Sequence, residues 1–126
     1  MRYITSAQGP KPIGHYAHAV EHNGTLYLSG QLPLDPATGK VAGVTAAEQT
    51  ERALQNIALV LAAAGSGPDR VLKVTVYLSD FEQRAQVNAA YAKFFGAHTP
   101  ARATIPIAPL PNGMLVEIDA IAAVGN

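Results

Sequence analysis

Residues 71–79 run Val71-Leu72-Lys73-Val74-Thr75-Val76-Tyr77-Leu78-Ser79, so that apolar side chains alternate with mostly polar ones. Successive side chains of a strand point to opposite sides, and this alternation therefore predicts a strand with one buried face. The side chains expected to face a core are Leu72, Val74, Val76 and Leu78. Those expected on the opposite face are Lys73, Thr75 and Tyr77.

A helix is predicted on the N-terminal side of this strand. Thr45 and Glu48 have the spacing of a capping box, in which the two side chains satisfy backbone N–H groups at a helix start. Apolar residues then recur at helical spacing, at Leu54, Ile57, Ala58 and Leu61. The stretch Gly65-Ser66-Gly67-Pro68 is expected to end this helix.

A second helix is predicted after the strand. Asp80 is placed to cap its start, and Gly96 is expected to end it. Its apolar stripe is Val87, Ala90, Tyr91 and Phe94. A strand enclosed by two amphipathic helices indicates a sheet packed against helices.

Four more strands are predicted toward the two ends of the chain. They are residues 16–21, 25–31, 102–107 and 115–123. The first two are joined at Asn23-Gly24, a strong signal for a tight hairpin, and the last two by a proline-rich turn at residues 109–113. The element order ββαβαββ predicts a single α+β domain over residues 1–126, with a mixed sheet covered on one face by the two helices.

The two faces of this predicted sheet differ in chemistry. The face toward the helices is apolar and comprises Leu26, Leu28, Leu72, Val74, Val76, Val116 and Ile118. The opposite face would carry Tyr27, Ser29, Thr75, Tyr77 and Glu117. That face is too aromatic for free solvation and too polar for a second core, which predicts a subunit interface with polar pockets.

Composition excludes several classes of protein. The chain has 126 residues, 48% of them hydrophobic, which suits a folded core and not a disordered segment. Nine basic and nine acidic residues balance, without the basic cluster that nucleic-acid binding needs. The absence of cysteine excludes disulfides and thiolate chemistry. No signal-peptide core or membrane-length apolar run is present, so we expect a cytoplasmic protein without a membrane partner.

Arg102 stands out because charged residues make up only 14% of the chain. It lies in the apolar stretch 100–107, and the nearest acid in sequence, Glu117, lies in the apolar run 115–118. A buried guanidinium is normally matched by a carboxylate, which its planar fork binds bidentately. Arg102 therefore predicts binding of a small organic acid. An internal salt bridge is the alternative, and sequence spacing does not show whether Arg102 touches Glu117.

Five short segments follow one another along nearly the whole chain. They are Ile13-Gly14-His15-Tyr16, Leu28-Ser29-Gly30-Gln31, Val87-Asn88-Ala89-Ala90-Tyr91, Pro100-Ala101-Arg102-Ala103-Thr104 and Val116-Glu117-Ile118-Asp119-Ala120-Ile121-Ala122. In this order they resemble the signatures of the RidA/YjgF family of reactive-intermediate deaminases. The resemblance implies a chorismate-mutase-like α+β fold and a homotrimer with a ligand pocket at each subunit interface. It also implies a 2-iminobutanoate/2-iminopropanoate deaminase, which hydrolyses enamines and imines such as 2-aminoacrylate and 2-iminopropionate to 2-oxo acids and ammonia without a cofactor.

The same resemblance implies roles for single residues. Arg102 matches the family's carboxylate-binding arginine, and Glu117 matches the acid associated with water activation. The other matching pocket positions are Tyr16, Ser29, Gly30 and Asn88. Thr104 stands where the family often has cysteine, and we expect its backbone N–H to supplement Arg102. His15 replaces a common proline, which would place an imidazole beside the pocket.

Other functions are weighed against this one. A non-catalytic sensor of 2-oxo acids could use the same arginine and trimer. An endoribonuclease or translation inhibitor would need phosphate contacts that this neutral chain does not suggest. A metal site is disfavoured because His15, His18 and His22 would share a face only on a helix, and that segment is predicted to be a strand. Ser29 lacks the first glycine of a nucleophile elbow.

Overall fold

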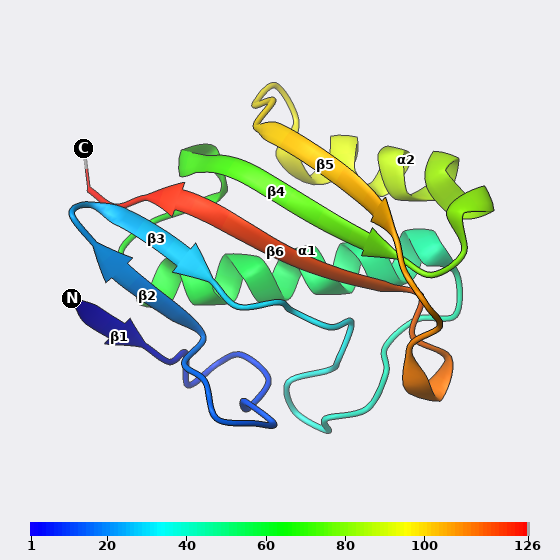
Figure 1. Ribbon diagram of the computed structural model, residues 1–126, viewed down its shortest axis with the longest axis horizontal. Coiled ribbons are helices and arrows are strands. Elements are labelled where there is room, and N and C mark those ends of the chain that lie inside the picture. The colour runs from blue at the N-terminus through cyan, green and yellow to red at the C-terminus, as the bar shows by residue number, and fades with distance from the viewer. Residues whose placement is uncertain (126) are drawn as a thin grey trace.

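A six-stranded sheet in the order β1-β2-β3-β6-β4-β5 forms one layer of the molecule (Figure 1). The computed structural model describes residues 1–125. The strands are β1 (Arg2–Ile4), β2 (Ala19–His22), β3 (Thr25–Leu28), β4 (Val71–Leu78), β5 (Ala101–Pro106) and β6 (Val116–Ala123). Neighbouring strands are antiparallel except for β4 and β5, which are parallel, so the sheet is mixed as predicted.

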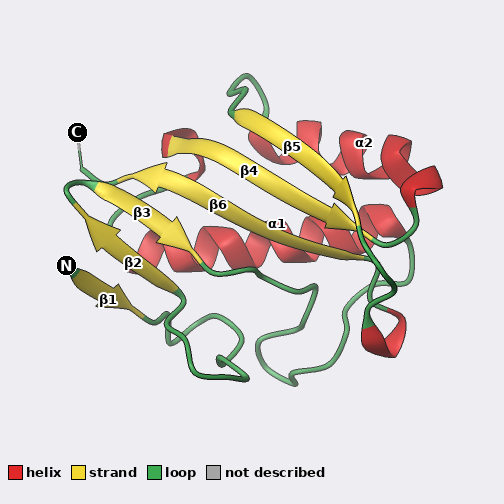
Figure 2. Ribbon diagram, in the orientation of Figure 1, coloured by secondary structure: helices red, strands yellow, loops and turns green. Residues whose placement is uncertain are grey.

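Both α-helices lie behind the sheet in Figure 2, on the same face. They are α1 (Ala46–Ala63) and α2 (Arg84–Phe95), and three short 3-10 turns are η1 (Pro68–Arg70), η2 (Phe81–Gln83) and η3 (Pro111–Gly113). The fully buried apolar side chains between the layers include Leu26, Leu54, Ile57, Leu61, Val74, Val76, Leu78 and Ile118. The predicted α+β fold is thereby confirmed. Within residues 1–125, no helix combines the length and apolarity needed to cross a membrane.

The predicted helix signals are largely confirmed. The Thr45 hydroxyl accepts from the Glu48 N–H at 3.1 Å and Glu48 accepts from the Thr45 N–H at 3.0 Å, which completes the capping box of α1. Gly96 follows α2 with a φ of 62°, in the left-handed region that favours glycine. Asp80 caps the turn η2, which leads into α2, and does not cap α2 itself. Phe95 was missed as a buried residue of the second stripe.

The predicted orientation of Leu72 was wrong. Leu72 is 52% exposed, whereas Val71 is 1% exposed. The pairing of β4 with β6 passes from Val71–Ala122 directly to Lys73–Ile121, so Leu72 is an extra residue in β4. Such a β-bulge shifts the alternation of side chains by one position. From Val74 onward the alternation is as predicted.

The hairpin at Asn23-Gly24 is confirmed, although its strands are shorter than predicted. Asn23 and Gly24 have φ values of 52° and 79°, which a tight turn of this type requires at both positions. Residues 16–18 precede β2 and residues 29–31 follow β3. Gln31 rejoins the sheet as an isolated bridge to Ile118, so the backbone around residue 30 departs from regular pairing next to β6.

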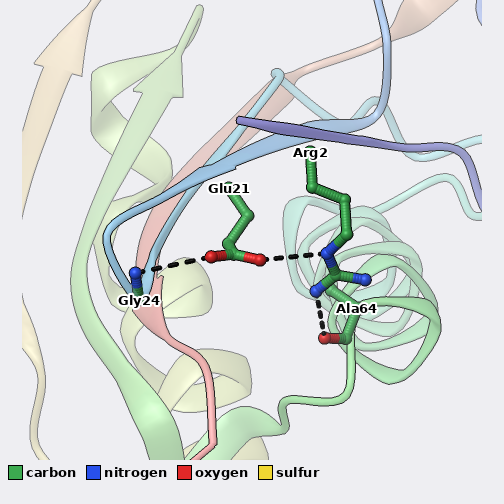
Figure 3. A network of polar contacts seen from close by, with 4 residues as sticks. All are labelled: Arg2, Glu21, Gly24 and Ala64. Atoms are coloured by element: carbon green, nitrogen blue, oxygen red, sulfur yellow. Dashed lines mark hydrogen bonds and ion pairs between the residues drawn. The ribbon is translucent and has the colours of Figure 1, made fainter.

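Strand β1 was not predicted from the sequence. The side chain of Arg2 joins it to its surroundings, because Nε donates to Glu21 Oε1 at 2.9 Å and a terminal guanidinium nitrogen donates to the Ala64 carbonyl at 3.1 Å (Figure 3). The hydrogen bond from Arg2 is also the main reason that the pKa of Glu21 is lowered. A strand of three residues offers too few alternating positions to be recognised from its sequence.

Gln49 of α1 fixes the entry to β6. Its amide nitrogen donates to the carbonyls of Gly43 at 3.2 Å and Gly113 at 3.0 Å, and its amide oxygen accepts from the Leu115 N–H at 2.7 Å. The Gln49 side chain is 1% exposed, whereas Gly43 and Gly113 lie at exposed positions of the chain. The segment that leads to Glu117 is thus held against α1 by a buried side chain.

Candidate active site

Arg102 lies on the edge strand β5, on the side of the sheet that faces the helices. The parallel register places it beside Val74, whose side chain is buried in the core. The guanidinium carbon lies 4.7 Å from the centre of the Tyr91 ring on α2, a cation–π contact. Because β5 is the last strand of the sheet, Arg102 remains exposed in the single chain.

Arg102 shares a cavity of about 160 Å³ with two other predicted site residues. The lining comprises Arg84, Val87 and Asn88 from α2 and Arg102 and Thr104 from β5. Thr104 pairs with Val76, so it points to the same side of the sheet as Arg102. The structure therefore brings Asn88, Arg102 and Thr104 together. An amide, a hydroxyl and a guanidinium in one small cavity form a set of donors suited to a carboxylate.

Arg102 has no acidic partner within the described chain. The one ion pair formed among residues 1–125 joins Arg2 to Glu21. The internal salt bridge to Glu117, which the sequence left open, is absent there. Arg102 is exposed in the single chain, because an edge strand leaves one flank of its side chains uncovered. The guanidinium is accessible to a ligand.

Glu117 lies on β6 and faces away from the helices. It pairs with Tyr77, and its side chain is half-buried. Gly30 leaves room for it, because a Cβ at residue 30 would lie 2.5 Å from Oε2 of Glu117. Burial raises the pKa of the Glu117 carboxyl, and the charge of Asp119 raises it further. A carboxylate of raised pKa is a stronger base, so it is better suited to accept a proton from water.

Asp119 and Tyr77 accompany Glu117 and were not predicted as site residues. The Tyr77 hydroxyl donates to Asp119 Oδ2 at 2.9 Å. This hydrogen bond is the main reason that the pKa of Tyr77 is raised, followed by burial. The sequence does carry a signal for this group, because residues two apart on a strand share a face, as Glu117 and Asp119 do.

Tyr16 and Ser29 lie beside the same open face of the sheet. The Ser29 hydroxyl donates to the Ala17 carbonyl at 2.7 Å, and the Tyr16 hydroxyl accepts from the Ile13 N–H at 3.2 Å. With His15 they line a wide hollow of about 640 Å³, and Tyr16 also shares a small crevice with Gly30. The imidazole of His15 therefore lies beside the predicted pocket positions.

The predicted site residues thus form two groups on opposite faces of the sheet. Asn88, Arg102 and Thr104 lie on the helix side, while Glu117 and Gly30 lie on the open side, with Tyr16 and Ser29 beside them. The single chain does not bring the two groups together. A site that used both would need the Arg102 group of one copy and the Glu117 group of another.

His18 has a structural environment different from that of His15. It is buried, its Nδ1 accepts from the Ser6 N–H at 2.9 Å, and its Nε2 lies 2.7 Å from the Pro10 carbonyl. A carbonyl can only accept, so Nε2 carries the proton and donates. Both ring nitrogens are occupied in holding the N-terminal segment beside the hollow that Tyr16 lines.

Comparison with known proteins decides the family. Residues 6–124 match the family model described as Endoribonuclease L-PSP. The solved structure of the YjgF gene product from E. coli superposes with a TM-score of 0.91 at 35% identity, and the match covers 98% of both chains. The chain belongs to the RidA/YjgF family. The family that the five segments indicated is therefore confirmed.

Two other RidA/YjgF relatives bear on ligands and chemistry. A bovine protein named 2-iminobutanoate/2-iminopropanoate deaminase is 43% identical, over 98% of this chain and 90% of that protein. The structure of E. coli TdcF with bound serine has a TM-score of 0.92 at 30% identity, covering 99% of this chain and all of that one. One of these relatives carries a deaminase name, and the structure of the other holds serine.

Tyr91 is a further residue beside the site of this RidA/YjgF chain, and it is buried as predicted. It was assigned to the apolar stripe of the second helix, yet its ring also supports Arg102. Burial raises the pKa of Tyr91, while the charge of Arg102 acts in the opposite direction. The sequence carries a signal in the spacing of Asn88 and Tyr91, since residues three apart share a helix face.

Proposed function

We propose that this protein hydrolyses 2-imino and 2-enamino acids, such as 2-iminopropionate formed from 2-aminoacrylate, to 2-oxo acids and ammonia. The observation that carries the proposal is the cavity in which Arg102 lies beside Asn88 and Thr104 without an acidic partner among residues 1–125. The name of the bovine relative supports the same chemistry. The reaction needs only water, a charge anchor and an acid–base group, so the proposal includes no cofactor.

Arg102 would bind the substrate carboxylate. Its fork can pair with both carboxylate oxygens, while the Tyr91 ring beneath it restricts its motion. Asn88 and the backbone N–H of Thr104 would supply further hydrogen-bond donors to the carboxylate. Backbone N–H groups near Gly30, which belong to the Glu117 group, would reach the substrate from the opposite side. Fixing the carboxylate also fixes the adjacent imine carbon. Holding this carbon in a set orientation near the attacking water lowers the barrier to hydrolysis.

Glu117 would activate the water. Its carboxylate accepts a proton as the water oxygen bonds to the imine carbon, and the nitrogen takes protons as the C–N bond breaks and ammonia leaves. Because burial raises the pKa of Glu117, the carboxyl can both accept that proton and return it. Tyr16 and Ser29 would line the part of the site around Glu117 and orient the ligand there.

The complete site would lie between copies of the chain. A homotrimer with cyclic symmetry would place the Arg102 group of one subunit against the Glu117 group of the next, because a head-to-tail contact joins two different surfaces. The open sheet face supports this arrangement, since it carries the exposed ring of Tyr27 together with Glu117 and Asp119. Each trimer would then hold one site at each of its interfaces.

The direct test is ammonia release from freshly generated 2-iminopropionate. The imine would be formed in the assay, and the spontaneous hydrolysis rate would be subtracted at each protein concentration. The proposal expects a rate that increases with protein concentration and that saturates with substrate. A rate equal to the uncatalysed one, with a folded protein of trimeric mass, would contradict it.

A ligand sensor is the second candidate function. The bound serine in TdcF favours it, because that structure shows a relative holding a small carboxylate-bearing ligand. The same Arg102 cavity would then bind a 2-oxo acid without turnover. Saturable binding of pyruvate or 2-oxobutyrate without ammonia release would identify this case.

An endoribonuclease is a third candidate function, because the family model is described by that activity. The balance of nine basic and nine acidic residues argues against it, because RNA affinity depends on phosphate neutralisation. RNA binding that weakens steeply with added salt, together with cleavage, would support that activity in place of the deaminase.

A further inference from the structure

Residues 6–16 form a strap that lies between β1 and β2 and contains no helix or strand (Figure 1). Within residues 1–125, the strap makes two hydrogen bonds to the rest of the chain, and both are to the ring of His18. The Ser6 N–H donates to Nδ1 at 2.9 Å, and Nε2 donates to the Pro10 carbonyl at 2.7 Å. The backbone of His18 is itself fixed, because its carbonyl accepts from the Ser29 N–H at 2.9 Å. One side chain therefore provides the polar attachment of the whole strap.

The strap carries Tyr16, which the proposed function places in the part of the site around Glu117. The Tyr16 hydroxyl accepts from the Ile13 N–H at 3.2 Å, so the ring is tied to the strap. Tyr16 lines one crevice with His18 and Gly30, and Gly30 is the residue that leaves room for Glu117. A displacement of the strap would therefore move Tyr16 relative to Gly30 and Glu117.

The neutral ring of His18 is the form that holds both ends of the strap. Nδ1 must be an acceptor for the Ser6 N–H while Nε2–H donates to Pro10, and protonation of Nδ1 would set two donors against each other. His18 is 1% exposed and Ser6 is 5% exposed, so water cannot replace the lost acceptor while the strap is closed. Acid therefore favours an open strap.

The charges around His18 offer no compensation for a protonated ring. The titratable side chains of the neighbouring elements are Lys11, His15 and Tyr16 of the strap, Arg2 and Tyr3 of β1, Glu21 and His22 of β2, and Tyr27 of β3. Lys11 and Tyr16 line the crevice with His18, whereas residues 30–34 add no titratable group to it. The one acid of the set, Glu21, is paired with Arg2. A positive His18 would therefore gain no carboxylate partner in the closed strap.

We propose that His18 is a positioning residue that, in its neutral form, closes the strap and sets Tyr16 beside Glu117, and that protonation of His18 opens the strap. The effect on activity rests on the proposed deaminase function, whereas the closing and opening of the strap do not. Acidification through the range in which imidazole gains its proton would then loosen the Glu117 part of the site in a protein that stays folded.

Hydrogen exchange of the Ser6 amide, followed by NMR, measures the closed strap directly. Its protection relative to an unfolded peptide would be compared at about pH 7.5 and about pH 5.5, a range in which histidine changes charge. Glutamine in His18→Gln offers an acceptor and a donor without titrating, and leucine in His18→Leu offers neither. His22→Gln is the matched control, because His22 is an exposed histidine of β2. The amide of Val76, in the buried strand β4, reports global unfolding.

The expected results differ among the four proteins. In the parent and His22→Gln, Ser6 should lose about tenfold or more of its protection at the lower pH. His18→Gln should keep the protection at both pH values and His18→Leu should lack it at both, while Val76 stays protected throughout. Equal protection of Ser6 at both pH values in the parent would overturn the proposal, as would a loss in His18→Gln that matches the parent. If a substitution at His18 prevents folding, the change at Ser6 relative to Val76 in the parent and in His22→Gln decides.

Kinetics at neutral pH test the positioning of Tyr16. For 2-iminopropionate, His18→Leu should raise KM by about tenfold with kcat nearly kept, because an open strap weakens binding more than chemistry. His18→Gln should restore the parent KM. A parental KM in His18→Leu would overturn the positioning role. If the parent releases no ammonia, the proposed function fails, and the exchange of Ser6 decides the strap by itself.

Discussion

Gly30 and Glu117 lie so close together that a side chain at residue 30 and the carboxylate of residue 117 exclude each other. A Cβ on Gly30 would lie 2.5 Å from Oε2 and 3.0 Å from Cδ of Glu117. The glycine is required here by this close approach, because its φ is not in the left-handed region. The position of the carboxylate therefore depends on a missing side chain on the neighbouring segment.

Gly30→Ala should reduce activity without unfolding the protein. The added methyl group must displace the Glu117 side chain. Because the base would then be misplaced, we expect kcat of the variant to fall about tenfold or more. Steady-state kinetics with 2-iminopropionate would measure the loss. Gly9→Ala is the matched control, because a Cβ there meets its nearest atoms at an ordinary 3.6 Å. Equal activity of the two variants would show that the place of the carboxylate is unimportant.

Glu117→Gln should raise the thermal stability at neutral pH and leave it unchanged in acid. Burial raises the pKa of Glu117 in the folded chain, so below the ordinary carboxyl pKa the group is protonated in both states. As the pH rises between the ordinary and the raised pKa, the unfolded chain ionises first and the folded state loses stability. Glutamine does not ionise, so the variant avoids this loss.

The measurement is Tm against pH at one fixed protein concentration for the parent and Glu117→Gln. Glu82→Gln, at an exposed position, is the control for removing a negative charge. If the parent were more stable than Glu117→Gln at neutral pH, the ionised carboxylate would be stabilised by a partner in the folded state. That result would contradict the raised pKa of Glu117.

The sheet faces on which Arg102 and Glu117 lie show how much of the site could be predicted from the sequence. Alternation along residues 71–79 indicated the buried side chains of β4 correctly from Val74 onward, because pleating is a local property. Placing Arg102 beside Val74, and Glu117 beside Tyr77, required the pairing of strands distant in sequence. Spacing within one segment carries no information on that pairing, so the separation of the two groups could not be predicted.

Two further features of the structure could not be predicted, because their physical causes lie outside the local sequence pattern. The bulge at Leu72 is set by the register between β4 and β6, which no run of residues within β4 encodes. The exposure of Arg102 follows from the position of β5 at the edge of the sheet, and Pro106 in the same strand is compatible with that position. The capping box and the hairpin were predicted correctly because their interactions lie within a few residues.

Arg102→Ala should separate substrate binding from folding. The side chain is exposed and fills no core layer, so the variant should keep its helical content and oligomeric mass. Loss of a desolvated charge pair of about 2–5 kcal/mol would lower kcat/KM by about 30-fold to several thousand-fold. Arg102→Lys should recover little, because an ammonium keeps the charge but loses the fork. A folded alanine variant with near-parental activity would exclude Arg102 as the anchor.

Gln49→Leu should destabilise the fold. The substitution leaves the carbonyls of Gly43 and Gly113 and the N–H of Leu115 without the partners that Gln49 provides. Each fully buried unsatisfied group costs about 1–3 kcal/mol, but Gly43 and Gly113 lie at exposed positions where water can replace the lost partner, so we expect a total loss of about 2–4 kcal/mol in the free energy of unfolding. Denaturant titration would measure it. Gln55→Leu, at an exposed position of α1, should change little, and equal effects would contradict the role of the buried bonds.

Mixed assembly of two inactive variants should restore activity if the site is shared between subunits. Arg102→Ala lacks the anchor and Glu117→Gln lacks the base, and the two residues lie on opposite faces of the sheet within one chain. In a cyclic trimer mixed at equal amounts, about a quarter of the interfaces would pair an intact Arg102 with an intact Glu117. Ammonia release near that fraction of the parent rate is the expected result. Light scattering would confirm the trimer at micromolar concentration, and two different affinity tags would confirm mixing. If mixed trimers stay as inactive as either variant alone, the two groups do not serve one active site, and the shared pocket must be abandoned.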